Sequence, residues 1–176
     1  MRKGNIPIKQ IIIDKETIED LDDIRAVVSA AFENHPHSNQ TEHILVDALR
    51  DAGALTVSLV AKISGRIVGH IAFSPVTIDG KTCNWYGLAP VSVHPDFQRQ
   101  GIGGLLVKAG LSELHTLGAL GCVLLGEPEY YGRFGFKTID GVTLVGVPPE
   151  YFLALPFIQD EVQGAVTYHE AFAVCG

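Results

Sequence analysis

The chain has 176 residues, of which 47% are hydrophobic and 19% are charged, and its formal net charge is −7. This balance is that of an ordinary globular protein and excludes an intrinsically disordered chain. The length predicts a single domain over residues 1–176 with enough chain to bury a core. The negative charge argues against nonspecific nucleic-acid binding, although backbone amides at a helix start can still hold an anion locally.

Neither the cysteines nor the N-terminal segment predicts an extracellular or membrane protein. Cys83, Cys122 and Cys175 lie far apart and show no CxxC spacing, so we predict neither a disulfide framework nor a zinc site. The N-terminal segment carries positive charge without the apolar core of a secretory signal, and no run approaches the length of a membrane span. We therefore expect a cytoplasmic protein that acts without a membrane.

The N-terminal third predicts one strand and two helices. The β-branched run 6–14 predicts the strand. Residues 41–53 predict an amphipathic helix with Asn39 or Thr41 as its cap and Gly53 as its end. An earlier helix is predicted over residues 15–32, because apolar side chains recur there at helical spacing, at Ile18, Leu21, Ile24, Val27, Val28 and Ala31.

The period changes to that of strands after residue 53. Residues 54–93 predict a meander of three antiparallel strands with turns at Gly65 and at Asp79-Gly80. A loop, a helix over about 101–118, a short buried strand, a short helix with proline at its start, and late strands follow. This order predicts a mixed α/β (α+β) sheet with helices on both faces.

The turn QRQGIGG, residues 98–104, lies between a predicted strand and a predicted helix. Its glycines permit positive φ and close approach of a ligand, and the first helical turn has amide donors without intrahelical partners. Together these features predict a site for an anion such as a pyrophosphate. A P-loop is disfavoured because no GxxxxGK[ST] motif is present, and a Rossmann unit is disfavoured because the turn follows antiparallel strands.

Two segments resemble the GCN5-related N-acetyltransferase (GNAT) family. VSVHPDFQRQGIGGLLV is similar to that family's acyl-CoA-binding segment, and LLGEPEYYGRFGFK is similar to its later Tyr-x-x-x-Gly-Phe segment. The matched positions are Gln98, Gly101, Gly103, Tyr131, Gly135 and Phe136. The resemblance covers about residues 6–140, and the tail 141–176 is similar to a bacterial subgroup of predicted N-acetyltransferases. It implies a mostly antiparallel sheet with one splayed parallel pair, and C-terminal strands that complete the sheet or the acceptor site.

The resemblance implies acetyl-CoA as co-substrate. The pyrophosphate would lie on the amides of the glycine turn, and the pantetheine arm would pair with the preceding strand, where an amide near Val91 would stabilise an oxyanion. Pro90 fits a strand that lacks a neighbour, and Arg99 either adds charge near a phosphate or is an exposed solubilising residue. The implied cofactor-binding residues are Val91, Ser92, Val93, Gln98, Arg99, Gln100, Gly101, Ile102, Gly103, Gly104, Tyr131 and Phe134.

The resemblance also implies that Tyr131 is the general acid that protonates the leaving sulfur. A phenol of ordinary pKa, about 10, is protonated at neutral pH; the alternative is a packed aromatic residue. The general base stays open, because the strand WYGLAPVSV has no acid. Glu127 and Glu33 are the candidate bases, together with His35 and His37 beside Glu33, and a water chain would need none of them.

Three histidines, His35, His37 and His43, lie within nine positions. Metal ligation needs a converging geometry and usually carboxylate or cysteine ligands, and the first two histidines lie in a segment that contains a proline. No metal site is therefore predicted.

Three functions are compatible with these patterns. The leading one is an N-acetyltransferase that moves acetyl from acetyl-CoA to a primary amine by direct attack in a ternary complex. A covalent acyl-enzyme is disfavoured because no cysteine occupies the motif tyrosine position. The alternatives are a non-catalytic acyl-CoA-binding sensor or partner module, which the missing strand acid favours, and a nucleotide-binding protein unrelated to CoA. The acceptor amine, and a homodimer formed through the C-terminal strands, stay open.

Overall fold

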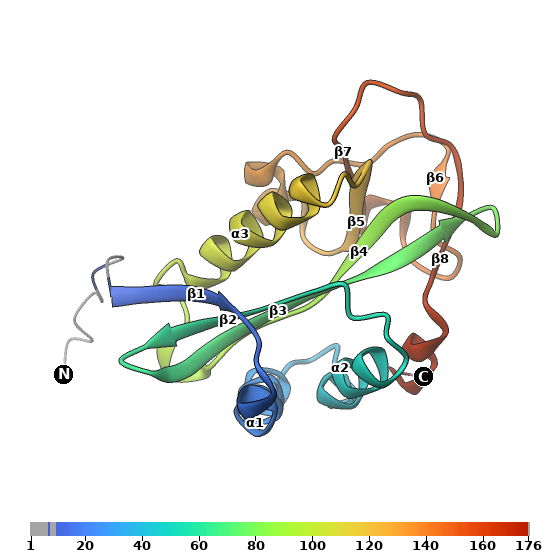
Figure 1. The fold of residues 1–176 in the computed structure, drawn as a ribbon. Helices are drawn as coiled ribbons and strands as arrows, with labels where there is room; N and C mark the ends of the chain where they lie inside the picture. The colour runs from blue at the N-terminus through green and yellow to red at the C-terminus, as the bar shows by residue number, and fades with distance from the viewer. Residues whose placement is uncertain (1–6, 8–9, 176) are drawn as a thin grey trace.

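A central β-sheet with helices on both faces forms the body of the molecule (Figure 1). The structure is a computed structural model that describes residues 7 and 10–175. The helices are η2 (Ile18–Asp20), α1 (Leu21–Phe32), α2 (Glu42–Asp51), η3 (Pro95–Phe97), α3 (Ile102–Thr116), α4 (Pro128–Tyr131), η4 (Gly132–Phe134), η5 (Pro149–Tyr151) and η6 (Glu170–Cys175). The strands are β1 (Ile11–Lys15), β2 (Val57–Ile63), β3 (Arg66–Ile78), β4 (Lys81–Val93), β5 (Gly121–Leu125), β6 (Val142–Thr143), β7 (Phe152–Pro156) and β8 (Gly164–Tyr168).

The sheet is mostly antiparallel. Its main path runs β1-β2-β3-β4-β5-β7, and β8 pairs with the far end of β3 and with the short β6. Within the main path, β4 and β5 form the parallel pair, and the helix α3 connects them. The predicted mixed fold, with a largely antiparallel sheet and one parallel pair in its centre, is confirmed.

Alternation along the strands sends neighbouring side chains to opposite faces. Leu59, Ile71 and Leu88 pack with α3 in the largest apolar cluster. Val60, on the other face, packs with α1 and α2. Figure 1 shows α3 on one face and α1 and α2 on the other, as the sequence predicted.

The start of the first helix differs from the prediction. Ile18 was expected on the buried face, but its side chain is 85% exposed. The reason is that residues 18–20 form a separate 3₁₀ turn, in which the Thr17 amide donates to the Asp20 carboxylate at 2.8 Å. The periodicity of α1 itself is correct, with Ile24, Val27 and Val28 buried. The strand predicted over residues 6–14 is observed from Ile11 onward, and most of its residues before Ile11 lie outside the described part of the chain.

The C-terminal tail lies against α2 (Figure 1). Phe172 of η6 packs against the buried Leu45 and Leu49 of α2. Asn39, a candidate helix cap, instead donates its side-chain amide to the Cys175 carbonyl at 2.6 Å. Thr41 takes the N-cap position of α2. The loop between the two N-terminal helices is therefore tied to the end of the chain.

No helix in the described part of the chain is both long enough and apolar enough to cross a membrane.

Candidate active site

A gap opens between β4 and β5 in the middle of the sheet. The parallel pairing stops after Gly87↔Val123, so β4 has no partner in β5 from Leu88 onward. On its other edge, β4 contains a bulge: Leu88 pairs with Phe73 and Val91 with Ile71, so that two residues of β4 oppose one of β3. A bulge bends its strand, and this bulge lies where β4 leaves β5.

The open edge of β4 presents backbone groups. The His94 amide donates to Val68 of β3 at 2.8 Å. Because successive residues of a strand direct their backbone groups to opposite edges, Val91 and Val93 direct theirs away from β3. The Val93 carbonyl accordingly accepts from the Gln98 side-chain amide at 3.0 Å. The Ser92 hydroxyl is buried and has no hydrogen-bond partner among the described residues, and the side chain lies on the other face from Val91.

The glycine turn connects this open edge to α3. Arg99 and Gly101 adopt left-handed conformations with φ of 64° and 84°. Gly101 is the N-cap residue and has no side chain to cap the helix, so the first amides of α3 stay open. Ile102 and Leu106 are fully buried against the sheet and fix the direction of those amides.

The segment around α4 lies over the first turn of α3. A Cβ atom placed on Gly103 would be 3.3 Å from the Tyr130 hydroxyl oxygen, and one on Gly104 would be 3.8 Å from the Phe134 ring. The Arg133 guanidinium lies over the Tyr130 ring, 4.5 Å from its centre. The structure therefore places Phe134, a candidate cofactor-binding residue, beside the glycine turn, together with Tyr130 and Arg133, which were not among the candidates.

Tyr131 packs closely on the end of β5. Its ring lies so near Gly126 that a Cβ atom there would overlap it. Burial, with a smaller contribution from Tyr130, raises the pKa of Tyr131 to about 12. Its phenol therefore carries a proton at neutral pH and is available as a donor.

The two candidate bases lie apart. Glu127 is exposed at the N-cap of α4, and its carbonyl accepts from the Tyr131 amide at 3.0 Å. Glu33 is exposed after α1, whereas Tyr131 packs with the cluster on the α3 face. Of the two candidate bases, only Glu127 belongs to the same segment of the chain as Tyr131. His35 and His37 beside Glu33 are exposed, and the described residues contain no group of three potential metal ligands.

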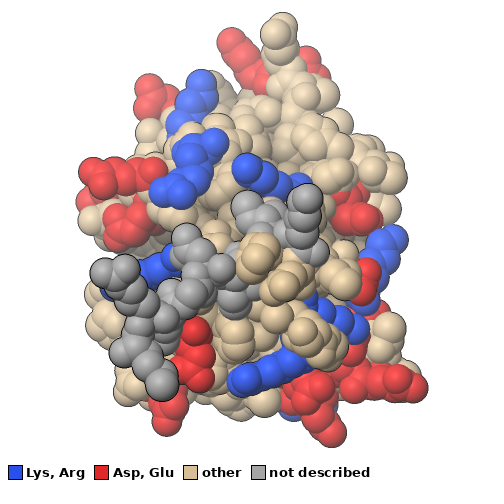
Figure 2. Space-filling model, turned by 90° about the vertical axis from the view of Figure 1, so that its left-hand side faces the viewer, with Lys and Arg blue, Asp and Glu red and all other residues tan. Residues whose placement is uncertain are grey.

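A hollow of about 550 Å³ lies between α3 and the α4 region, lined by Lys108, Leu111, Ser112, His115, Arg133 and Phe134. Two of these side chains are cationic. Figure 2 shows the end of the molecule that is on the left in Figure 1, where lysine and arginine side chains lie between acidic ones. The net charge of −7 therefore does not prevent a locally cationic surface.

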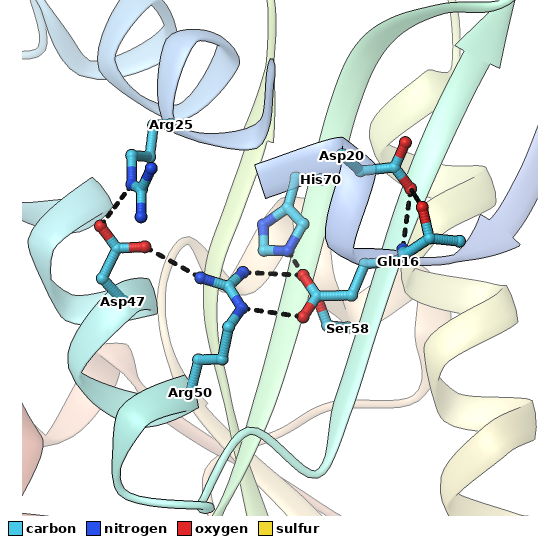
Figure 3. A network of polar contacts seen from close by, with 8 residues as sticks. Glu16, Asp20, Arg25, Asp47, Arg50, Ser58 and His70 are labelled. Carbon is cyan, nitrogen blue, oxygen red and sulfur yellow. Dashed lines mark hydrogen bonds and ion pairs between the residues drawn. The ribbon is translucent and has the colours of Figure 1, made fainter. Parts of the chain in front are cut away.

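On the other face, a polar network joins the sheet to α2 (Figure 3). Arg50 makes a bidentate pair with Glu16, at 3.0 and 2.8 Å. The Ser58 hydroxyl donates to Glu16 and contacts His70 Nε2, both at 2.8 Å. Asp47 accepts from Arg50 at 2.8 Å and from Arg25 of α1 at 2.7 Å. The network therefore fixes both N-terminal helices beneath the sheet.

The contacts define the protonation of this network. Because the Ser58 proton goes to Glu16, Ser58 accepts from His70 Nε2–H, which leaves His70 Nδ1 as an unpartnered acceptor. Burial lowers the pKa of His70 to about 4, although Glu16 opposes this shift. Burial raises the pKa of Glu16, but the hydrogen bonds from Arg50 and Ser58 outweigh it and the pKa is lowered overall. No local sequence pattern indicated this network, because its members come from five separate segments of the chain.

The model of the "Acetyltransferase (GNAT) domain" family matches residues 13–139. The chain belongs to the GNAT family. It is similar to the N-acetyltransferase YhbS of Escherichia coli strain K12, with 38% identity over 128 residues that cover 72% of this chain and 74% of that protein.

Two solved structures of GNAT proteins resemble the whole chain. One, a GNAT acetyltransferase of Brucella melitensis in complex with acetyl-CoA, has 51% identity and a TM-score of 0.83, over 92% of this chain and 97% of that one. The other, YhbS of Escherichia coli in complex with CoA, has 32% identity and a TM-score of 0.87, over 96% and 94%. The predicted family and the acyltransferase class are thereby confirmed, and both related proteins were solved with the predicted co-substrate or its CoA part bound.

Proposed function

We propose that this GNAT enzyme transfers an acetyl group from acetyl-CoA to a primary amine by direct attack within a ternary complex. The observation that carries the proposal is the open edge of β4, which is followed, after the short helix η3, by the glycine turn. A strand edge and a set of free helix amides suit the two ends of one ligand, an amide-bearing arm and a pyrophosphate. The related Brucella protein, which binds acetyl-CoA, supports this assignment.

In this proposal the amides from Gln98 to Gly104 hold the pyrophosphate. The pantetheine arm pairs with the outward backbone groups of Val91 and Val93. For this pairing, the hydrogen bond from the Gln98 side chain to the Val93 carbonyl breaks, and the arm takes its place. In this proposal Ser92 does not contact the arm, because its backbone groups face β3 and its side chain is buried on the other face of the sheet. Arg133 and Lys108 place positive charge along the hollow between α3 and α4, where it would stabilise the phosphates of the nucleotide end.

The transfer needs an oxyanion donor and an acid. The amine nitrogen attacks the thioester carbon, the outward Val91 amide stabilises the oxyanion, and Tyr131 protonates the departing sulfur. The amine must lose one proton, to Glu127, to Glu33 or to solvent through water. Cys122 is fully buried and burial raises the pKa of its thiol, which disfavours a covalent acyl-cysteine.

The test is release of CoA thiol from acetyl-CoA with a panel of amines: small metabolites, peptide N-termini and lysine side chains. Tyr131→Phe removes only the hydroxyl, so kcat should fall by about 100-fold while the KM for acetyl-CoA stays within about threefold. Tyr151→Phe, at an exposed tyrosine of η5, is the control and should keep wild-type kinetics. Full activity of Tyr131→Phe would remove the general-acid role.

A second candidate function is a non-catalytic acyl-CoA-binding module. The feature that favours it is the lack of any carboxylate on β4 beside the open edge. It requires CoA binding without thiol release on any amine of the panel, whereas amine-dependent release supports the enzyme.

The homodimer expected through the C-terminal strands is a separate proposal. Light scattering on the same preparation measures the molar mass and so tests whether a dimer forms.

A further inference from the structure

The C-terminal tail places an aromatic ring at the closed end of the gap between β4 and β5. Tyr168, the last residue of β8, pairs with Val76 of β3. Its ring packs so closely on Gly87 that a Cβ atom there would overlap it. Gly87 is the last residue of β4 that pairs with β5. Tyr168 therefore covers the point at which the two strands separate.

Tyr168 and Tyr131 approach the gap from opposite faces. Tyr131 packs with the cluster that contains Cys122 and Leu124 of β5. Tyr168 packs with the cluster that contains Val123, the residue between them. Since successive residues of a strand point to opposite faces, the two rings lie on different sides of the sheet.

The closed end of the gap is also filled from the α3 face. The Cys122 side chain is fully buried, and its thiol lies by the Leu88 amide, the first of β4 beyond the pairing. The thiol is near enough to Tyr168 to contribute to its raised pKa, for which burial is the main cause. Cys122 and Tyr168 therefore lie on the two faces of the sheet at the closed end of the gap.

The position of Tyr168 is fixed by the tail. Its ring lies 4.8 Å from that of Phe172, and Phe172 packs on α2. None of the hydrogen bonds among the described residues uses the Tyr168 hydroxyl. The position of the ring is therefore fixed by packing contacts and not by a hydrogen bond of its hydroxyl.

We propose that Tyr168 on one face of the sheet and Cys122 on the other form the end wall of the acyl pocket and restrict the donor to short acyl groups. This inference rests on the proposed function, in which the cofactor runs from the glycine turn along Val93 and Val91 toward Leu88. An acyl group at the end of that arm points toward Gly87. Acetyl fits short of the wall, whereas each further methylene of propionyl or butyryl meets the ring.

Calorimetric titration of CoA, acetyl-CoA and butyryl-CoA tests this without an acceptor. In the wild type, butyryl-CoA should bind at least about tenfold more weakly than acetyl-CoA. Tyr168→Ala should abolish or reverse this preference, since each newly buried methylene is worth about fourfold in affinity. Tyr168→Phe keeps the ring and should keep the preference, as should Tyr151→Ala on the exposed η5 tyrosine.

The Kd for CoA itself is the control for folding, because CoA has no acyl group to meet the wall. If Tyr168→Ala binds CoA as the wild type does but still prefers acetyl-CoA tenfold, the inference is overturned. Equal wild-type affinities for acetyl-CoA and butyryl-CoA also overturn it, while leaving acetyl transfer intact. Failure of the wild type to bind CoA would overturn the proposed function and this inference together.

Tyr168→Trp is a second test, which enlarges the ring and so leaves no cavity, unlike Tyr168→Ala. A larger ring should weaken acetyl-CoA by about tenfold relative to CoA. An unchanged ratio of the two Kd values in a variant that still binds CoA would contradict the wall.

Discussion

The two faces of the central sheet are constructed differently. On the α3 face the residues proposed to hold the cofactor come mainly from one continuous stretch, 91–104, and pack on an apolar cluster. On the opposite face, Glu16, Arg50, Ser58 and His70 come from four separate segments of the chain, and the C-terminal tail closes over α2. The proposed cofactor site is therefore a local feature of the chain, whereas the polar network on the opposite face is assembled from residues far apart in the sequence.

The two faces also differ in the interactions that stabilise them. The Glu16 and Arg50 side chains are partly buried, so that removing either one would leave the other charge desolvated without its partner. The Glu16–Arg50 pair therefore makes the position of α2 specific. The apolar α3 face depends instead on buried area and close packing, which no single pair controls.

The largest expected effect is on the local site. Gly103→Glu adds a side chain where Tyr130 leaves 3.3 Å and places a negative charge beside the pyrophosphate. We expect CoA affinity to fall by about 100-fold or more, which is about 3 kcal/mol, in a folded variant. Calorimetric titration with CoA measures it. Thr116→Glu adds the same charge at the exposed far end of α3 and should bind normally; wild-type affinity in Gly103→Glu would remove the glycine turn from the site.

The next effect is on the polar face and depends on pH. The pKa of His70 is about 4 in the fold and about 6.5 in an unfolded chain. Between these values the unfolded chain binds a proton that the folded one does not, so stability present above pH 6.5 is lost as pH falls. His70 should contribute a loss of about 2 kcal/mol between pH 7.5 and 5.

Urea unfolding across this pH range checks the contribution. His70→Gln removes the titrating group and should flatten the pH dependence by that amount, whatever its effect at pH 7.5. His115→Gln, at an exposed histidine of α3, is the matched control and should keep the wild-type profile. Equal slopes in His70→Gln and the wild type would show that His70 does not carry the effect.

The smallest effect sharpens the boundary of the cofactor site. Arg133 is exposed and stacked on Tyr130, so Arg133→Gln should weaken CoA by about three- to tenfold at low salt. The loss should shrink as salt is raised, because an exposed charge is screened. Lys81→Gln, at the β3–β4 turn, removes the same charge elsewhere and should change little. A loss independent of salt would point to packing on Tyr130 and not to charge.

The parts predicted from sequence share one property, which is that their signal lies within a few residues. The glycine turn and the helix after it follow from local patterns, whereas the approach of Phe134 to Gly104 comes from the tertiary structure. Ile18 was placed wrongly because helical spacing alone does not reveal where a 3₁₀ turn precedes the helix. His70 gave no signal in an apolar strand, since its partner Ser58 lies on another strand.

By itself, the sequence determined the meander, the glycine turn with its free amides and the motif tyrosine, because these depend on backbone conformation and periodicity over short stretches. Only the tertiary structure decided where β4 parts from β5, that His70 stays neutral beside Ser58 and that Tyr168 lies on Gly87. These features depend on which distant segments pack together and on how deeply the side chains are then buried. A local sequence pattern contains no information on the packing partners or on the burial.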